Sequence, residues 1–323
     1  MHRMSRRLLA LCCLSLATSA WAQGKFPDGP IKMVVPFAAG GGVDSAARLI
    51  AKQLGANLNV AVLVENRPGA NGSVGGKFVQ TAPGDGSTLL FSASTHALVR
   101  QVMAQPPYDP VNDFAMVARV GQAPLMMVIS PSLPQTKLPE VIAAARQSPD
   151  KWTAALPALG AASHLGTLMF AKEGGLSQLA TAVYKGTAPA LTDVAGGHVQ
   201  IQIDAIIALQ AMAKAGKVKP IMVTSPKRSP VMPGVPTAVE SGYPKFVAES
   251  WYGVWAPKAT PADRVQFLNR AINEAVQQLT KSGAFEAMGV DPVTEGVEDF
   301  RKYMLAYIAE SAELLKGAGF KPE

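Results

Sequence analysis

The chain has 323 residues, of which 48% are hydrophobic, 30 are lysine or arginine and 23 are aspartate or glutamate. This length is enough for one large or two medium domains with a substantial core. The basic residues are scattered rather than gathered into a stripe, which argues against a nucleic-acid-binding protein. No apolar run beyond the N-terminal segment reaches the roughly 20 residues of a membrane-spanning helix, so the protein is not expected to be embedded in a membrane.

The first 22 residues have the three parts of a cleavable secretory signal peptide. Arg3, Arg6 and Arg7 form a basic start, residues 8–16 form a short apolar run, and Ala20-Trp21-Ala22 provides an A-x-A cleavage site. The apolar run is too short for an uncleaved membrane anchor. Cleavage would remove three arginines and no acid, which lowers the net charge from +7 to +4. It would also remove Cys12 and Cys13, so the predicted mature chain has no disulfide or thiolate chemistry.

Short apolar strands and amphipathic helices alternate from residue 31 onward. The first series consists of strands at 31–35, 60–64 and 88–92 and helices at 43–54 and 73–81. These strands are apolar on both faces, as parallel strands covered on both sides are. The pattern predicts an α/β architecture.

A second series of elements follows and suggests a second lobe. Its predicted strands lie at 125–129, 152–156, 180–184, 199–203 and 218–223, and its helices at 139–147, 163–172, 188–194 and 206–215. A strand at 250–256 and helices at 261–279 and 297–316 then return to complete the first lobe. The predicted organisation is therefore one lobe of residues 23–122 plus 250–323 and a second of residues 123–249, with a ligand cleft between them.

A glycine-rich loop joins the first predicted strand to the first predicted helix. It contains Phe37, Ala38, Ala39, Gly40 and Gly41, and Asp44 follows in the first helical turn. Glycines let the backbone approach a ligand closely, and the free N–H groups of a helix start favour an anion. The alternative is a tight turn in which Asp44 simply complements the helix dipole.

Two further strand-to-helix loops have similar chemistry. One spans residues 65–73 and includes Ala70, Asn71 and Ser73; the other spans residues 184–190 and includes Lys185, Gly186 and Thr187. The first could supply a second ring of backbone donors, or be an ordinary turn in which Ser73 caps a helix. Lys185 could attract an acid, or be a solvated lysine.

The sequence patterns of common enzymes and metal sites are missing. There is no G-x-S-x-G or H-E-x-x-H motif, and His96, His164 and His198 lie far apart. Ser163 precedes His164 directly, and such neighbours cannot form a catalytic pair, so Ser163 is expected to be a helix cap. We therefore predict no catalytic residues, no metal ligands and no cofactor.

At these loops the sequence resembles the Bug-type periplasmic solute-binding receptors, the extracytoplasmic component of tripartite tricarboxylate transporters. The resemblance covers nearly the whole predicted mature chain. Its segments are Val34-Val35-Pro36-Phe37, Asn66-Arg67-Pro68-Gly69-Ala70, residues 83–90, Tyr108-Asp109-Pro110, Tyr184-Lys185-Gly186, residues 196–199, Ser241-Gly242-Tyr243-Pro244 and Trp251-Tyr252-Gly253.

The resemblance implies a two-lobe periplasmic binding protein fold of type II, the Venus flytrap, acting as a monomer without enzymatic activity. Such a receptor binds a small organic acid in its cleft and passes it to membrane subunits of a transporter. The family's carboxylate-binding loops map onto residues 37–41 and 70–73, with Asp44 close by and Ser94 and Thr95 on a further first-lobe loop. The specificity-setting second-lobe positions map onto Ala161, Ser163, residues 184–187 and Asp204.

One segment departs from the family pattern. Where the family has a stretch rich in serine and glycine before His164, this chain has the apolar residues 155–162. This substitution predicts a ligand with one carboxylate and an apolar or aromatic remainder rather than a citrate-like acid. A secreted α/β hydrolase and a ligand-binding component of a signalling system remain the alternatives.

Overall fold

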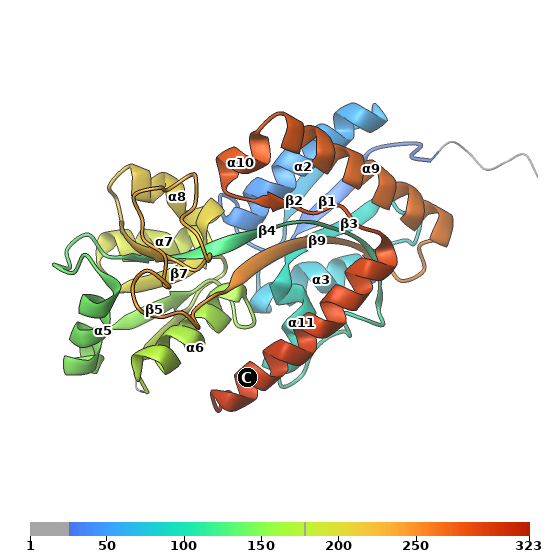
Figure 1. Cartoon of the computed structure of the whole chain (residues 1–323). Helices are drawn as coiled ribbons and strands as arrows, with labels where there is room; N and C mark the ends of the chain where they lie inside the picture. Colours follow the sequence, from blue (N-terminus) through green and yellow to red (C-terminus); the bar gives the residue numbers. More distant parts are fainter. Residues whose placement is uncertain (1–25, 178) are drawn as a thin grey trace, which may run out of the picture.

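The computed structural model describes residues 26–177 and 179–323, so the predicted signal peptide lies outside the described residues. The molecule is built around a mixed sheet with helices on both faces (Figure 1). The strands are β1 (Ile31–Val35), β2 (Val62–Asn66), β3 (Thr88–Ala93), β4 (Phe114–Ile129), β5 (Thr153–Leu156), β6 (Ala180–Val183), β7 (Ile201–Ala205), β8 (Lys219–Val223), β9 (Glu249–Pro257) and β10 (Asp291–Pro292).

The longer helices agree closely with the predicted periodicity, whereas the short α4 and α10 were not predicted. The α-helices are α2 (Gly42–Leu58), α3 (Ser73–Gln80), α4 (Val99–Val102), α5 (Leu138–Gln147), α6 (Ala162–Gly174), α7 (Thr187–Gly196), α8 (Ile206–Lys214), α9 (Ala262–Lys281), α10 (Ala284–Met288) and α11 (Val297–Gly317). Short 3₁₀ turns are η1 (Ala70–Gly72), η2 (Ser94–Leu98) and η3 (Pro149–Lys151). The α/β prediction is confirmed.

The sheet divides into two halves that share one strand. The strand order is β2-β1-β3-β9-β4-β7-β5-β6, and β8 and β10 also pair with β4. In the first half, β1 pairs in parallel with both β2 and β3, and β9 joins β3 antiparallel. In the second half, β5 pairs in parallel with β6 and β7. We call these halves, with the helices that cover them, the first and second lobes.

Strands β4 and β9 cross together from one lobe to the other. β4 pairs with β9 over residues 114–124 and with β7 over residues 125–129. The predicted strand at 125–129 was too short by eleven residues at its start. Gly121, Gln122 and Pro124 interrupt the apolar run there, and the register shifts twice between β4 and β9, so neither alternation nor a continuous apolar run marks this part of the strand.

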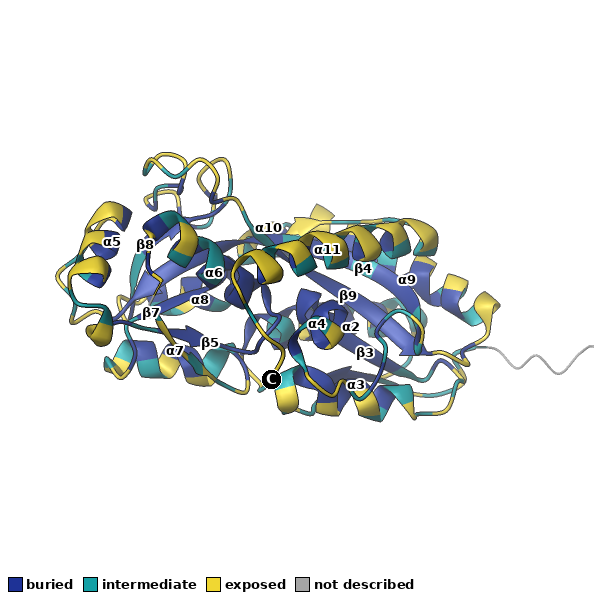
Figure 2. Cartoon of the chain, turned by 90° about the horizontal axis from the view of Figure 1, so that it is seen from below, coloured by how far each residue is buried: buried dark blue, intermediate teal, exposed yellow. Residues whose placement is uncertain are grey.

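Helices cover both faces of the first lobe's sheet. α2, α9 and α10 lie on one side and α3 and α11 on the other (Figure 1). The strands are buried between these layers, whereas the outer faces of the helices are exposed (Figure 2). Trp251 and Trp255 of β9 are fully buried and pack against Phe300 of α11. The long C-terminal helix is thereby fixed to the crossing strands.

The C-terminal segment contacts both lobes. α11 packs on β4 and η2 in the first lobe and on α6 in the second. Beyond it, the Phe320 ring lies 4.9 Å from the His164 ring, and the Glu323 N–H donates to the Val102 carbonyl at 3.1 Å. The tail was predicted to complete the first lobe; in the structure it also spans the junction of the two.

Candidate functional site

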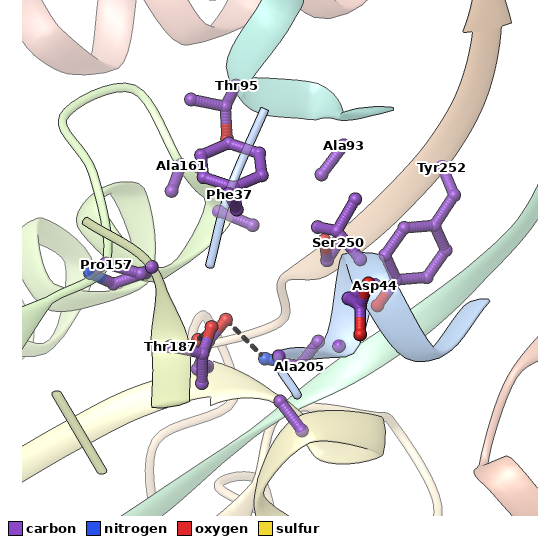
Figure 3. A pocket seen from close by; sticks show the side chains of 17 residues that line it. Phe37, Asp44, Ala93, Thr95, Pro157, Ala161, Thr187, Ala205, Ser250 and Tyr252 are labelled. Carbon is purple, nitrogen blue, oxygen red and sulfur yellow. Dashed lines mark hydrogen bonds between the residues drawn. The ribbon is translucent and has the colours of Figure 1, made fainter. Parts of the chain in front are cut away.

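A cavity lies between the lobes at the ends of several strands (Figure 3). It is lined by residues of both lobes and of the crossing strand β9. They are Phe37, Gly41, Gly42, Val43, Asp44, Ala93, Thr95, Pro157, Ala161, Ala162, Gly186, Thr187, Asp204, Ala205, Ala208, Ser250 and Tyr252.

Four helices begin at this cavity. Gly42, Val43 and Asp44 open α2, and the starts of α6, α7 and α8 contribute Ala162, Thr187 and Ala205 with their neighbours. The first N–H groups of a helix have no partner within it, and the aligned peptides place about half a positive charge at that end. A cavity surrounded by four such ends is suited to an anion.

A hydrogen-bond network centred on Asp44 holds the glycine loop in shape. The Asp44 carboxylate accepts hydrogen bonds from the Gly40 N–H at 2.9 Å, Arg48 Nε at 3.0 Å and Asn66 Nδ2 at 2.9 Å. Asn66 Nδ2 also donates to the Phe37 carbonyl at 3.0 Å. Gly40 has a φ of +82°, which a side chain would strain. Asp44 therefore positions the loop and is already paired with a cation.

The pKa of Asp44 reflects this pairing. Burial alone would raise it, but the hydrogen bonds from Arg48, Gly40 and Asn66 outweigh burial and hold the pKa below its usual value. Asp44 is thus ionised at neutral pH, and its charge is balanced by the Arg48 guanidinium.

The second loop has an unusual backbone and reaches across to the other lobe. Gly69, Ala70, Asn71 and Gly72 all have positive φ, which is costly for Ala70 and Asn71. Asn71 Oδ1 accepts the Leu159 N–H at 3.0 Å. Across the same junction, the Ala38 N–H donates to the Lys185 carbonyl at 3.2 Å. These two hydrogen bonds join the lobes across their junction.

Asp204 lies on the second-lobe side of the cavity without a basic partner. It accepts hydrogen bonds from Thr187 Oγ1 at 2.6 Å and from the Ala205 N–H at 2.8 Å. Burial raises the pKa of Asp204 to about 6, although these hydrogen bonds oppose the shift. No lysine, arginine or histidine is among the residues that line the described cavity.

Eight of the seventeen predicted site residues line the cavity. They are Phe37, Gly41, Asp44, Thr95, Ala161, Gly186, Thr187 and Asp204. The other nine do not: Ala38, Ala39, Gly40, Ala70, Asn71, Ser73, Ser94, Ser163 and Lys185. Ala38, Gly40, Asn71 and Lys185 instead form the loop and interlobe hydrogen bonds described above. The contact of these nine residues with a ligand stays a prediction.

Two predicted helix caps are wrong. α6 has Ala161 at its N-cap and Ser163 inside its first turn, and α3 has Gly72 at its N-cap and Ser73 as its first residue. Neither helix has a side-chain cap. Ser163 is fully buried, and no hydrogen-bond partner of its hydroxyl is found among the described residues.

Sequence reasoning missed the contribution of strand β9. Ser250 and Tyr252 both line the cavity, although only the strand itself was predicted. Their spacing of two residues places both side chains on one face of the strand, a pattern that could have identified them. Pro157 and Ala162, from the apolar segment 155–162, also line the cavity.

Neither a metal site nor a membrane span is found in the part of the chain that the structure describes. No group of three or more histidine, cysteine, aspartate or glutamate side chains in residues 26–177 and 179–323 is placed to hold a metal ion. No helix in the same ranges is both long enough and apolar enough to cross a bilayer.

The sequence profile of the family described as "Tripartite tricarboxylate transporter family receptor" matches residues 46–320. The chain belongs to this family. It is 36% identical to protein BugT of Bordetella pertussis (strain Tohama I) over 321 residues, which cover 98% of both chains. Members of the family are solute-binding receptors, so the chain is a binding protein and not an enzyme.

Solved structures of relatives share the fold and include two with named carboxylates. R. palustris Rpa4515 with adipate superposes with a TM-score of 0.88 at 31% identity, covering 92% of this chain and 100% of that one. MatC (Rpa3494) from Rhodopseudomonas palustris with bound malate gives a TM-score of 0.83 at 28% identity, covering 90% and 100%. The two-lobe binding protein fold is confirmed.

Proposed function

We propose that this receptor captures a small organic anion in the cavity between its lobes and delivers it to the membrane subunits of a tripartite tricarboxylate-type transporter. The observation that carries the proposal is the convergence of four helix starts on one cavity. Their N–H groups would bind a carboxylate without any basic side chain. The adipate and malate named for two relatives fit the same chemistry.

The ligand would have one carboxylate and a mainly apolar remainder. The predicted apolar segment does reach the cavity, where Pro157, Ala161 and Ala162 form one wall. Ala93, Ala205 and Ala208 add further apolar surface. A second carboxylate placed against this wall would lose its hydration without gaining hydrogen bonds.

Capture would proceed by closure about the crossing strands. The proposed lobe boundaries, 122/123 and 249/250, lie opposite each other, because Ala123 of β4 pairs with Ser250 of β9. Bending at this shared level would separate the lobes and break the Ala38–Lys185 and Leu159–Asn71 hydrogen bonds. A ligand that contacts both lobes would shift the population towards the closed form.

The site of action would be the periplasm. The relative BugD is a periplasmic binding protein, and the proposed signal peptide of residues 1–22 would direct export of a monomeric receptor. Periplasmic fractionation and N-terminal sequencing of the recovered protein test this: the chain should begin at Gln23. A protein that begins at Met1 would contradict it.

Titration calorimetry of the purified receptor tests the ligand class. Monocarboxylates with apolar remainders, such as phenylacetate and butyrate, should bind more tightly than citrate or succinate. Tight binding of citrate together with no binding of any monocarboxylate would overturn the proposed ligand class.

A further inference from the structure

Tyr252 places in the cavity a hydroxyl whose proton has no acceptor among the described residues. The residue lies on β9 and is 1% exposed, and its side chain lines the cavity. No hydrogen bond of normal geometry is found for its hydroxyl among the described residues. The nearby Ser250 hydroxyl lowers the pKa of Tyr252 as a donor to the phenolic oxygen, which leaves the phenolic proton without an acceptor. Buried polar groups are almost always hydrogen-bonded, and each exception needs an explanation. A ligand group that occupies the cavity would supply the missing partner.

Asp204 is close enough to Tyr252 to raise the pKa of its hydroxyl. Burial raises the pKa of Tyr252, the nearby carboxylate of Asp204 raises it further, and the Ser250 hydroxyl opposes the shift. The Asp204 carboxylate already accepts from Thr187 and Ala205, with a longer contact of 3.4 Å from Gln202. An ionised carboxylate has about four acceptor positions, so one further donor can be accommodated.

The two side chains together require one kind of group. Asp204 accepts a hydrogen bond but, when ionised, donates none, whereas the Tyr252 hydroxyl needs an acceptor. An alcohol does both at once, because it has one proton to donate and lone pairs to accept. An ammonium group has no lone pair for the tyrosine proton, a keto oxygen has no proton for Asp204, and a second carboxylate would be repelled by Asp204.

We propose that Tyr252 and Asp204 form a polar subsite that recognises a hydroxyl group on the ligand, so that the receptor selects hydroxy acids over their deoxy counterparts. This inference rests on the proposed function, because the carboxylate of the same ligand would be held by the helix starts. Tyr252 is the residue that distinguishes the subsite from the general anion site.

Calorimetric titration with matched pairs of acids tests the subsite. The pairs are butyrate with 2-, 3- and 4-hydroxybutyrate, and 3-phenylpropionate with 3-phenyllactate; 3-aminobutyrate is the ammonium analogue. In the unmodified receptor, at least one hydroxy acid should bind about tenfold or more tightly than its deoxy partner, the usual effect of satisfying a buried polar group.

Variants then locate the effect. Tyr252→Phe should abolish the preference for the hydroxy acid, and Asp204→Asn should reduce it, because an amide oxygen accepts more weakly than a carboxylate. Both variants should retain binding of the deoxy acid, which also shows that they are folded. Tyr243→Phe and Asp193→Asn make the same changes outside the cavity and should retain the preference.

Three results would overturn the inference. They are equal binding of hydroxy and deoxy acids, a preference that survives Tyr252→Phe, and tighter binding of 3-aminobutyrate than of any hydroxy acid. Failure of every acid to bind would overturn the proposed function together with the subsite, and is thus distinguishable from the other results.

Discussion

The two sides of the cavity use different chemistry. On the α2 side, the start of α2 at Gly41 and Gly42 lines the cavity, and the side chains of Asp44 and Asn66 hold the glycine loop before it. On the side of α6, α7 and α8, side chains face it: an apolar wall at Pro157 and Ala161, and the carboxylate of Asp204. The comparison suggests that the first side binds what all ligands of the family share, and the second sets which ligand is bound.

Removing the Asp44 carboxylate should have the largest effect on stability and binding, because this carboxylate holds the glycine loop on the α2 side of the cavity. Asp44→Ala removes the acceptor of the Gly40 N–H and of Arg48 Nε, and one of the two acceptors of Asn66 Nδ2. We expect a loss of about 3 kcal/mol in the free energy of unfolding and weaker binding of every acid. Denaturant titration measures the first and calorimetry the second.

Glu65→Gln is the matched control for Asp44. Glu65 pairs with Lys32 and Arg67, but about a third of its side chain is exposed. Such a surface pair contributes about 0–1 kcal/mol. If both variants lost the same free energy of unfolding, the proposed role of Asp44 in holding the glycine loop would be contradicted.

Blocking closure should have the next largest effect. A Cβ at Gly42 would lie 3.0 Å from Ile207 Cγ2 and 3.2 Å from Ala208 Cβ, both on α8 of the second lobe, which packs directly against α2. Gly42→Val should hold the lobes apart and weaken binding by about 2 kcal/mol, or roughly thirtyfold. Small-angle scattering with ligand should give a larger radius of gyration than the unmodified protein.

Gly317→Val provides the control for closure, since nothing lies within 4 Å of a Cβ there. Its affinity and radius of gyration should match those of the unmodified protein. An unchanged affinity in Gly42→Val would show that binding does not need the closed form.

Asp204 should make stability depend on pH in a way that Asp44 does not. Its pKa is raised from 3.8 to about 6 by burial, so its contribution to stability is fully present below about pH 4 and is lost as the pH rises through 6. Between pH 5 and 7 the unliganded protein should lose about 1 kcal/mol that Asp204→Asn does not lose.

The sign for Asp44 is opposite. Its pKa is lowered in the folded state, so its contribution is present above its unfolded pKa and is lost as the pH falls through the folded value. Denaturant titrations at pH 5 and 7 on the unmodified receptor and on Asp204→Asn check the Asp204 contribution. The same change in the free energy of unfolding with pH in these two proteins would contradict the assignment of a raised pKa to Asp204.

A hydroxyl on the apolar wall should have the smallest effect. Ala161→Ser restores one donor at the wall, so adipate should gain about 0.5–1 kcal/mol relative to butyrate. The same change at Ala143 of α5, which is exposed and does not line the cavity, should leave the ratio of affinities unchanged. Equal gains in both variants would argue against the wall as the determinant of ligand class.

Much of the fold could be predicted because the apolar patterns are strong. Continuous apolar runs identified β1 and β3, and the periodicity of Ala46, Ala47, Ile50 and Leu54 identified the buried face of α2. The first part of β4 could not be predicted, because it bends between the lobes and contains Gly121 and Pro124. Its length depends on pairing with β9, which is distant in the sequence.

The loops of the candidate site could be predicted from the sequence, but the properties of its buried side chains could not. The glycine loop and Thr187 stand out from their composition, whereas the family resemblance alone suggested Asp204. The raised pKa of Asp204 and the buried hydroxyl of Tyr252, whose proton has no acceptor, depend on burial, which arises only when β7 and β9 come together. Local sequence therefore indicates where a ligand binds better than which ligand it is.

Mass spectrometry of small molecules released by denaturing the purified receptor tests the central claim most directly. We predict an organic acid bound at up to one molecule per chain, with a single carboxylate, and its loss from protein that carries Gly42→Val. A released compound without any acidic group, bound at the same stoichiometry in both proteins, would contradict the account.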